Sequence, residues 1–226
     1  MLNEVSLFTG YAGMTLGLRL AGLLVRTVLY VEIDRKVREN IIIPRIRDGL
    51  LDDAPVWDDI RSLRGRELEG LVDIVTAGFP CQPHSAAGKH LGPEDPRNLW
   101  PDTIRIIREA RPRWALLENS SRVLSRRGGQ PAYGLDIIRD LAQAGYDAVW
   151  VVVSACDAGA PHLRERWFCL AWDADGGGRK GPDQGAELET MQAAEPYRAG
   201  GLAPPGLAHP HRLGQQGRGD GRGEVP

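Results

Sequence analysis

The sequence has no uninterrupted apolar run long enough to span a bilayer, which excludes a hydrophobic transmembrane helix. Its first residues, MLNEVSLFTG, lack both the basic start and the apolar segment of a secretory signal. Only three cysteines occur, an odd number without the close spacing of a metal knuckle, so neither a disulfide framework nor a metal site is expected. We therefore expect a cytoplasmic protein that works in a reducing setting without membrane contact.

Neither sign of charge dominates the chain. The formal net charge is −2, so the protein as a whole does not attract nucleic acid, and any contact with DNA has to come from a local basic patch. Hydrophobic residues make up 42% and charged residues 26% of the sequence, proportions typical of a globular protein. At 226 residues the chain is long enough for one substantial hydrophobic core.

Short β-type runs alternate with helical patterns over residues 1–173. Strands are expected at 4–8, 27–33, 72–78, 113–119, 148–154 and 166–172, and helices at 13–23, 34–48, 97–110 and 133–144. This alternation predicts an α/β fold with a mostly parallel central sheet. Residues 174–226 are rich in Gly and Pro and lack periodicity, so we expect a separate, poorly structured tail with at most a short helix near 186–195.

Three residues are expected to mark helix ends. Asp34 suits the N-cap of the second helix, because its carboxylate can accept hydrogen bonds from the first free N–H groups. Pro112 should stop the third helix, since proline cannot continue a helical hydrogen-bond ladder. Gly145 suits the C-terminal cap of the fourth helix.

The segment VSLFTGYAGMTLGL predicts a strand, a glycine-containing turn and a helix. Gly10 and Gly13 would let the backbone approach a ligand closely beside the helix N-terminus. The next strand ends in YVEID, and an acid at that position can accept hydrogen bonds from a ribose diol; Glu32 is our choice for it. Two interpretations stay open here: a site for an adenosine-containing cofactor, and a structural turn followed by a helix cap.

The third apolar strand leads into GFPCQPHSAAG. Cys81 stands between Pro80 and Gln82, among loop-forming and polar residues instead of the apolar neighbours of a core cysteine. A thiolate on this loop would lie at the same sheet edge as the first turn and would be a good nucleophile. A structural role remains the alternative for Cys81, and it is the role that we assign to Cys156 and Cys169.

Two further segments carry polar groups at strand ends. RWALLENSS ends a strand with Glu118 and Asn119, which could act in catalysis or cap the next helix. GAPHLRERWFCLAW presents Arg164 and Arg166 before another apolar strand, and alternate residues of an extended segment point the same way. The alternative for these arginines is a solvated entrance to the strand.

Taken in order, these segments resemble the DNA cytosine-C5 methyltransferases of bacteria and phages. FTGYAG is similar to the first cofactor turn of that family, VEID to its ribose-binding acid, and DDI at 58–60 to its adenine contact. GFPCQPHSAAG resembles its catalytic loop, DPRNLWPDTIRIIREARPRWALLENSS the helix and strand that lead to its catalytic acid, and GAPHLRERWF its arginine element. The resemblance covers residues 5–172 and implies a Rossmann-like methyltransferase fold that uses S-adenosylmethionine.

The resemblance implies methyl transfer from S-adenosylmethionine to C5 of a cytosine flipped out of double-stranded DNA. Cys81 would add to C6 of the cytosine, Glu118 would stabilise N3, and Arg166 with Arg164 would stabilise the O2 side. The residues implied near the DNA are Gln82 and Ser85. The residues implied around the cofactor are Phe8, Gly10, Tyr11, Gly13, Glu32, Ile33, Asp59, Ile60, Pro80 and Leu99.

The sequence also departs from the family pattern. His84 stands where Phe is usual, Ser120 where Val is usual, and His162 where Gln is usual, while Ile33 occupies a place where a larger ring often stacks on adenine. The larger departure is at the C-terminus. Neither a target-recognition domain nor the returning helix with its Asn-bearing motif is found, and residues 174–226 resemble only the start of a recognition region.

Two hypotheses of function follow. The first is the catalytic domain of a cytosine-C5 methyltransferase. The second is a truncated, non-catalytic remnant or half of a split enzyme, which binds the cofactor, DNA, or a second chain that supplies the missing recognition and C-terminal segments. A nicotinamide-dependent oxidoreductase is disfavoured, because the first turn lacks the GxGxxG spacing.

Overall fold

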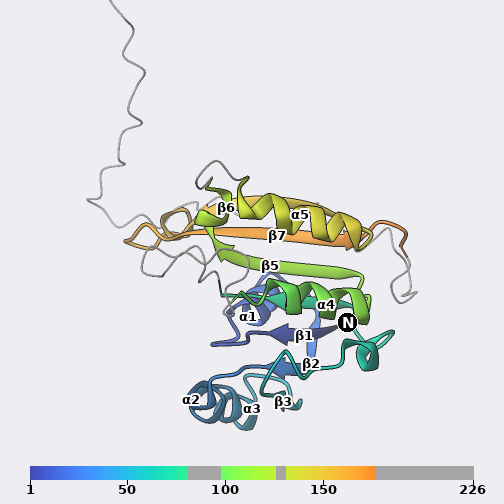
Figure 1. Ribbon diagram of the computed structural model, residues 1–226. Helices are drawn as coiled ribbons and strands as arrows, with labels where there is room; N and C mark the ends of the chain where they lie inside the picture. Colours follow the sequence, from blue (N-terminus) through green and yellow to red (C-terminus); the bar gives the residue numbers. More distant parts are fainter. Residues whose placement is uncertain (81–97, 126–130, 177–226) are drawn as a thin grey trace, which may run out of the picture.

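A seven-stranded sheet forms the centre of the computed structural model, which describes residues 1–80, 98–125 and 131–176 (Figure 1). Its strands follow the order β3-β2-β1-β4-β5-β7-β6. The bounds are β1 (Leu2–Leu7), β2 (Val25–Val31), β3 (Val56–Trp57), β4 (Ile74–Ala77), β5 (Trp114–Ser120), β6 (Tyr146–Ser154) and β7 (Glu165–Asp173). Strands β1 to β5 pair in parallel, whereas β7 is antiparallel to both β5 and β6. The predicted α/β fold with a mostly parallel sheet is confirmed.

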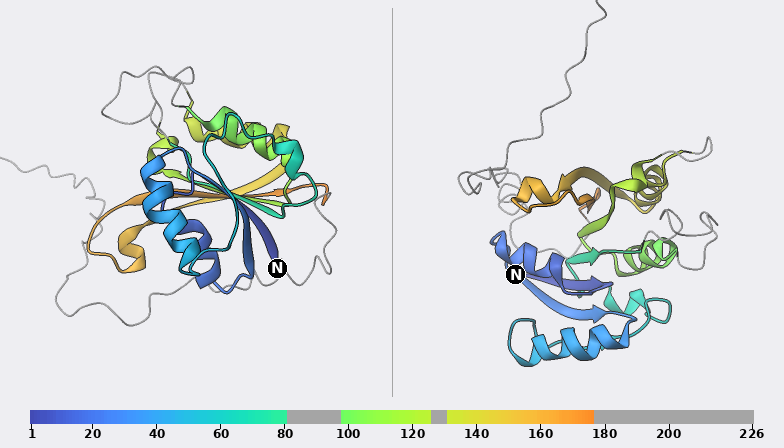
Figure 2. Two further views of the ribbon diagram at one scale, coloured as in Figure 1. Left: turned by 90° about the horizontal axis from the view of Figure 1, so that it is seen from below. Right: turned by 90° about the vertical axis from the view of Figure 1, so that its left-hand side faces the viewer.

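Helices lie on both faces of this sheet. Figure 2 shows α4 and α5 on one face and α1 to α3 on the other, over β1 to β3. The helical bounds are α1 (Gly13–Leu20), α2 (Arg35–Val37), a π-helical turn η1 (Arg38–Ile42), α3 (Ile43–Arg47), α4 (Trp100–Ala110) and α5 (Tyr133–Gln143), with 3-10 turns η2 (Gly65–Leu68), η5 (Ser121–Leu124) and η6 (Ala155–Ala158). Both faces of β1 and β4 are therefore buried over Val5–Leu7 and Ile74–Ala77, as their apolar sequences predict.

The three predicted helix ends are confirmed. The Asp34 carboxylate accepts a hydrogen bond from the Lys36 backbone N–H at 2.8 Å and so caps α2. Helix α4 ends one residue before Arg111, which turns into the left-handed region directly before Pro112. Gly145 adopts a φ of 87° just after the C-cap of α5. Helix α1 is shorter than predicted, because the chain leaves the helical path before Gly22, whose φ is 85°.

One half of the sheet lacks a helix on the α1 side among the residues that the structure describes. Side chains that face α4 and α5, such as Leu117 and Trp167, are fully buried. On the opposite face of the same strands β5 and β7, alternate residues are only half-buried; these are Leu116, Phe168, Leu170 and Trp172. The alternation marks a sheet face that these residues leave partly open.

A fully buried carboxylate connects four elements below the first turn. Glu4 of β1 accepts hydrogen bonds from the hydroxyl groups of Thr15 of α1 at 2.9 Å, Thr27 of β2 at 2.7 Å and Thr76 of β4 at 2.7 Å. Glu4, Thr15 and Thr76 are each 0% exposed. A buried acidic group is tolerated only when its oxygens are hydrogen-bonded, and here three hydroxyls supply those bonds.

The described residues contain no helix with the length and apolar character needed to cross a membrane.

We predict that Glu4→Ala lowers the free energy of unfolding by about 3 kcal/mol or more, because it removes the shared acceptor of three buried hydroxyls. Glu4→Gln should cost clearly less, since its amide can still accept from and donate to the threonines. Urea unfolding followed by circular dichroism measures both values. An Ala variant as stable as the Gln variant would contradict this role of Glu4.

Candidate active site

The predicted site residues that the structure describes gather at one edge of the sheet. Parallel strands β1, β2, β3, β4 and β5 all end there, so the segments that follow them lie next to one another. Strand β7 runs the other way, and its start is paired with the end of β5 through Arg166 and Ser120. Because β7 is antiparallel, it places Arg166 at the same edge as Glu118, although the two residues are 48 positions apart in the sequence.

The turn after β1 has an unusual backbone. Phe8, Gly10 and Ala12 have φ values of 54°, 53° and 56°, which lie in the left-handed region that non-glycine residues rarely adopt. Such conformations persist when the surroundings fix them, and they concentrate at ligand sites. An added Cβ on Gly13, the first residue of α1, would meet no atom within 4 Å, so space is open beside the helix N-terminus.

Glu32 fixes this turn to the end of β2. Its Oε2 accepts a hydrogen bond from the Gly10 backbone N–H at 2.9 Å, and its Oε1 accepts one from the Asp34 N–H at 2.9 Å. Tyr11 and Ile33 flank this contact and are 65% and 55% exposed. The Arg45 guanidinium lies 5.6 Å from the centroid of the Tyr11 ring. Glu32 and the glycine turn thus form one unit with exposed apolar surface beside it.

The segment after β3 is fastened by an arginine that the sequence analysis did not single out. Arg105 of α4 donates hydrogen bonds to the carbonyl oxygens of Ile60 at 2.8 Å and Leu63 at 2.9 Å. Ile60 is buried, while Asp59 pairs with Arg61, whose guanidinium holds the pKa of the Asp59 carboxyl below its usual value. An arginine inside an amphipathic helix gives no sequence signal for such backbone contacts.

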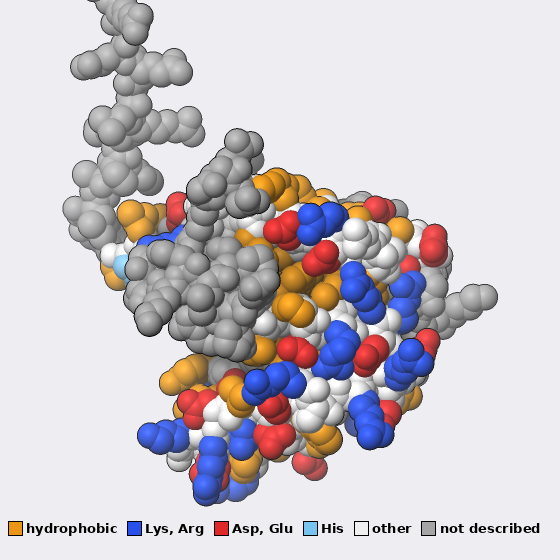
Figure 3. Space-filling view, viewed as in Figure 1, with side chains coloured by type: hydrophobic (Ala, Val, Ile, Leu, Met, Phe, Trp, Pro, Cys, Tyr) orange, Lys and Arg blue, Asp and Glu red, His pale blue; other side chains and the backbone are white. Residues whose placement is uncertain are grey.

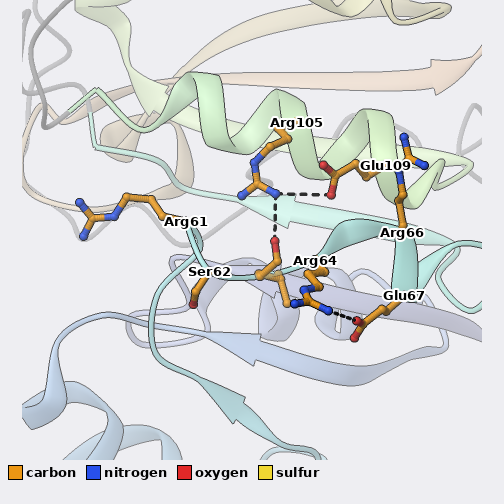
Figure 4. A pocket seen from close by; sticks show the side chains of 8 residues that line it. Arg61, Ser62, Arg64, Arg66, Glu67, Arg105 and Glu109 are labelled. Carbon is orange, nitrogen blue, oxygen red and sulfur yellow. Dashed lines mark hydrogen bonds and ion pairs between the residues drawn. The ribbon is translucent and has the colours of Figure 1, made fainter.

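A cavity of about 490 Å³ lies beside this segment, between α4 and the chain around η2 (Figure 4). Its lining carries ion pairs between Arg105 and Glu109 and between Arg64 and Glu67. None of the predicted site residues lines the cavity. The lining residues are Arg61, Ser62, Leu63, Arg64, Arg66, Glu67, Arg105 and Glu109.

Asn119 anchors the segment that follows β4. Its side-chain amide donates a buried hydrogen bond of 2.9 Å to the carbonyl oxygen of Phe79, and its Oδ1 accepts from the Ser120 N–H at 2.8 Å. The sequence analysis named Asn119 as part of a motif but did not foresee this contact. It holds Phe79, and with it Pro80, against the end of β5.

Glu118 and Arg166 form an ion pair, with Arg166 Nε 2.7 Å from Glu118 Oε1. The other oxygen of Glu118, Oε2, lies 3.3 Å from where a Cβ on Gly78 would stand, so a larger residue at this position would contact the carboxyl closely. Burial raises the pKa of Glu118, and the charges of Arg166 and Arg164 oppose that rise in part. The acid therefore keeps its proton to a higher pH than an ordinary glutamic acid.

Of the remaining predicted site residues, the structure describes Leu99 but not Cys81, Gln82 and Ser85. Leu99 is the N-cap residue of α4, whose N-terminus points to the same sheet edge. Cys81, Gln82 and Ser85 lie outside the described residues. Of the other cysteines, Cys169 is buried, which raises the pKa of its thiol to about 12, and Cys156 is exposed in η6. In the described part of the chain, no cluster of His, Cys, Asp and Glu could hold a metal ion.

The sequence of this chain is similar to those of known DNA methyltransferases. A family profile described as C-5 cytosine-specific DNA methylase matches residues 2–195. The type II methyltransferase M.CviJI of Paramecium bursaria Chlorella virus IL3A is 35% identical over 171 residues, covering 75% of this chain and 42% of that protein. M.NgoMIV of Neisseria gonorrhoeae is 31% identical over 173 residues, and the match covers 75% of this chain and 51% of that protein. The chain thus spans about half the length of these curated relatives.

Solved structures give the same picture of the fold. A crystal structure from an E. coli prophage, described as a DNA modification methyltransferase, superposes with a TM-score of 0.60 at 26% identity and covers 77% of this chain and 47% of its own. The Dnmt2 methyltransferase of S. pombe superposes with a TM-score of 0.59 at 21% identity, over 77% of this chain and 51% of its own, and supports the fold alone.

We predict that Arg166→Met raises the pKa of Glu118 further, because the variant removes the nearer of the two positive charges that stabilise the carboxylate. Arg164→Met should raise it less. Carbon-detected NMR titration of the Glu118 carboxyl measures both pKa values, and a lower pKa in Arg166→Met would contradict this account. Because the folded pKa lies above the unfolded one, the contribution of Glu118 to the free energy of unfolding falls as the pH rises between them.

Proposed function

The chain belongs to the family of C-5 cytosine-specific DNA methylases, and we propose that it is the catalytic part of an enzyme that methylates cytosine C5 in double-stranded DNA. The observation that carries this proposal is the meeting, at one sheet edge, of a raised-pKa glutamic acid, an arginine and the segment that leads directly to Cys81. Residues 1–173 would form this catalytic domain, and residues 174–226 the beginning of a recognition region.

The described residues fit S-adenosylmethionine. Bound there, this cofactor supplies an electrophilic methyl group. The left-handed turn at Gly10 and the open space beside Gly13 leave room for a ligand at the N-terminus of α1. Glu32 would accept hydrogen bonds from the ribose hydroxyls, and the exposed Tyr11 and Ile33 would gain burial against the cofactor. The other residues proposed around it are Phe8, Asp59, Ile60, Pro80 and Leu99.

Cys81 is the proposed nucleophile of the reaction. C5 of cytosine is a weak nucleophile until a thiolate adds to C6. In the proposal, Cys81 forms this S–C6 bond, and the ring becomes electron-rich at C5. After C5 has taken the methyl group, a base removes the C5 proton, the ring electrons return, and the S–C6 bond breaks to release Cys81 as thiolate.

Glu118 is suited to the charge that builds at N3 during this addition. A carboxyl group that keeps its proton can donate a hydrogen bond to N3, and burial supports that protonated state. The Arg166 guanidinium already contacts Oε1, so Oε2 on the Gly78 side is the oxygen proposed to face the base. Arg166 and Arg164 would stabilise the O2 side of the cytosine.

The positioning of Cys81 would depend on Asn119. Its hydrogen bond to the Phe79 carbonyl fixes the chain two residues before the cysteine. Gln82 and Ser85, which follow Cys81 in the sequence, are proposed to contact the DNA. The cytosine has to be flipped out of the duplex to reach these groups, because its C6 is stacked inside paired DNA.

DNA is the proposed substrate, and a second chain is the proposed source of the recognition and C-terminal segments. The sheet face around Leu116 and Phe168 is only half-buried by the described residues. Because central strands of such sheets are normally covered on both faces, this face is a suitable place for a further segment to pack. The alternative is a non-catalytic remnant. Incubation with methyl-labelled cofactor and mixed-sequence DNA distinguishes the two, because only an enzyme yields labelled 5-methylcytosine.

We predict that duplex DNA containing 5-fluorocytosine traps the protein covalently when S-adenosylmethionine is present. Fluorine at C5 cannot leave as a proton does, so the bond between Cys81 and C6 should persist. Denaturing electrophoresis reveals the adduct, and Cys81→Ser should abolish it while Cys156→Ser keeps it. Absence of an adduct across varied sequences, with candidate partner chains supplied, would favour the non-catalytic remnant.

We predict that Glu32→Gln weakens S-adenosylmethionine binding by about 10- to 100-fold, because hydrogen bonds to a charged acceptor contribute about 1.5–3 kcal/mol. The amide oxygen of Gln can still accept from the Gly10 N–H, so the turn itself should persist. Isothermal titration calorimetry measures the affinity. Glu39→Gln, at an exposed position nearby, is the matched control, and equal affinity in both variants would remove Glu32 from the cofactor site.

A further inference from the structure

Strand β6 is the last strand of the sheet and has a long edge that no other described strand covers. All nine residues from Tyr146 to Ser154 pair with β7 on one side. On the other side β6 has no strand partner among the described residues. The opposite end of the sheet differs, because β3 has only two residues. One edge therefore offers a row of backbone donors and acceptors about 30 Å long, at about 3.3 Å per residue.

The β6 edge is apolar as well as long. Val149, Trp150, Val151 and Val152 are 55%, 47%, 54% and 39% exposed, and the run from Ala148 to Ser154 contains no charge and no proline. Figure 3 shows hydrophobic side chains among charged ones along the upper rim, where Figure 1 places β6 and, in front of it, α5. Proteins usually protect such edges with charges, prolines, bulges or shortening, and the continuous register of β6 with β7 includes no bulge.

We propose that the β6 edge is an interface between two copies of this chain, in which the two β6 strands pair antiparallel about a two-fold axis. The interaction is independent of the proposed methyltransferase function. A two-fold axis perpendicular to the sheet, midway between Trp150 and its copy, keeps each face of one sheet continuous with the same face of the other. Trp150 then meets Trp150 of the second copy, Val149 meets Val151, and Ala148 meets Val152.

The sequence of β6 favours a second copy over an unrelated strand. The run from Ala148 to Val152 reads almost the same in both directions, so antiparallel self-pairing matches apolar with apolar at every position on both faces. The one charged residue of the strand, Asp147, meets Val153 in this register, so no like charges face each other.

Sedimentation velocity over a concentration series of the full chain tests the interface. The wild type should form a dimer with twice the 24.7 kDa mass of the chain. Val151→Lys should raise the dissociation constant of the dimer at least about tenfold, because it places two lysines on the paired edges. Val149→Lys should do the same. Leu20→Lys is the matched control, since Leu20 is 89% exposed on α1 away from β6, and it should leave the dimer intact.

Circular dichroism spectra and melting curves of the lysine variants show whether each variant is folded. A second readout uses Trp150→Cys in a Cys156→Ser background, which should form an intermolecular disulfide on mild oxidation because the two copies of position 150 face each other across the axis. A wild type that stays monomeric at its highest soluble concentration would overturn the proposal. A dimer that persists unchanged in both folded lysine variants would also overturn it, and would place the interface elsewhere.

Discussion

The buried carboxylate of Glu4 is the interaction on which the first half of the fold depends. Its hydroxyl partners come from α1, β2 and β4, so one side chain of β1 sets the spacing of three neighbours at once. Thr15 belongs to the first two turns of α1, which means that the helix behind the glycine turn is held to the sheet by a polar contact in addition to packing. The candidate cofactor turn connects β1 to α1, so the hydrogen bond between Glu4 and Thr15 helps to fix both of its ends.

The candidate site combines opposing electrostatic influences. Burial favours the neutral form of Glu118, while Arg166 and Arg164 favour its charged form, and burial is the larger influence. A stronger ion pair with Arg166 would keep Glu118 ionised. Without Arg166, nothing would orient the Glu118 carboxyl through its Oε1 atom. The contact at 2.7 Å orients the acid while its surroundings limit its ionisation.

Sequence patterns predicted the strands, the caps at Asp34 and Gly145 and the common edge of the site, because alternation, capping chemistry and parallel topology are local or follow from strand order. They did not predict the hydrogen bonds of Glu4 to three threonines, of Arg105 to the Ile60 carbonyl oxygen, or of Asn119 to the Phe79 carbonyl oxygen. These contacts join residues from 11 to 72 positions apart, and nothing in the spacing of a lone Glu, Arg or Asn identifies its partner. The two-residue strand β3 was also missed, since it is too short to show a period.

The direction of β7 constrains the path of the polypeptide that follows Asp173. Asp173 ends this strand beside the start of β5, at the rim of the sheet opposite Glu118 and Arg166. A continuation of the polypeptide that returns to the rim with the candidate site has to run back along the length of β7, which takes about nine residues at about 3.3 Å each when fully extended. A tether shorter than that would confine whatever follows Asp173 to the rear of the molecule.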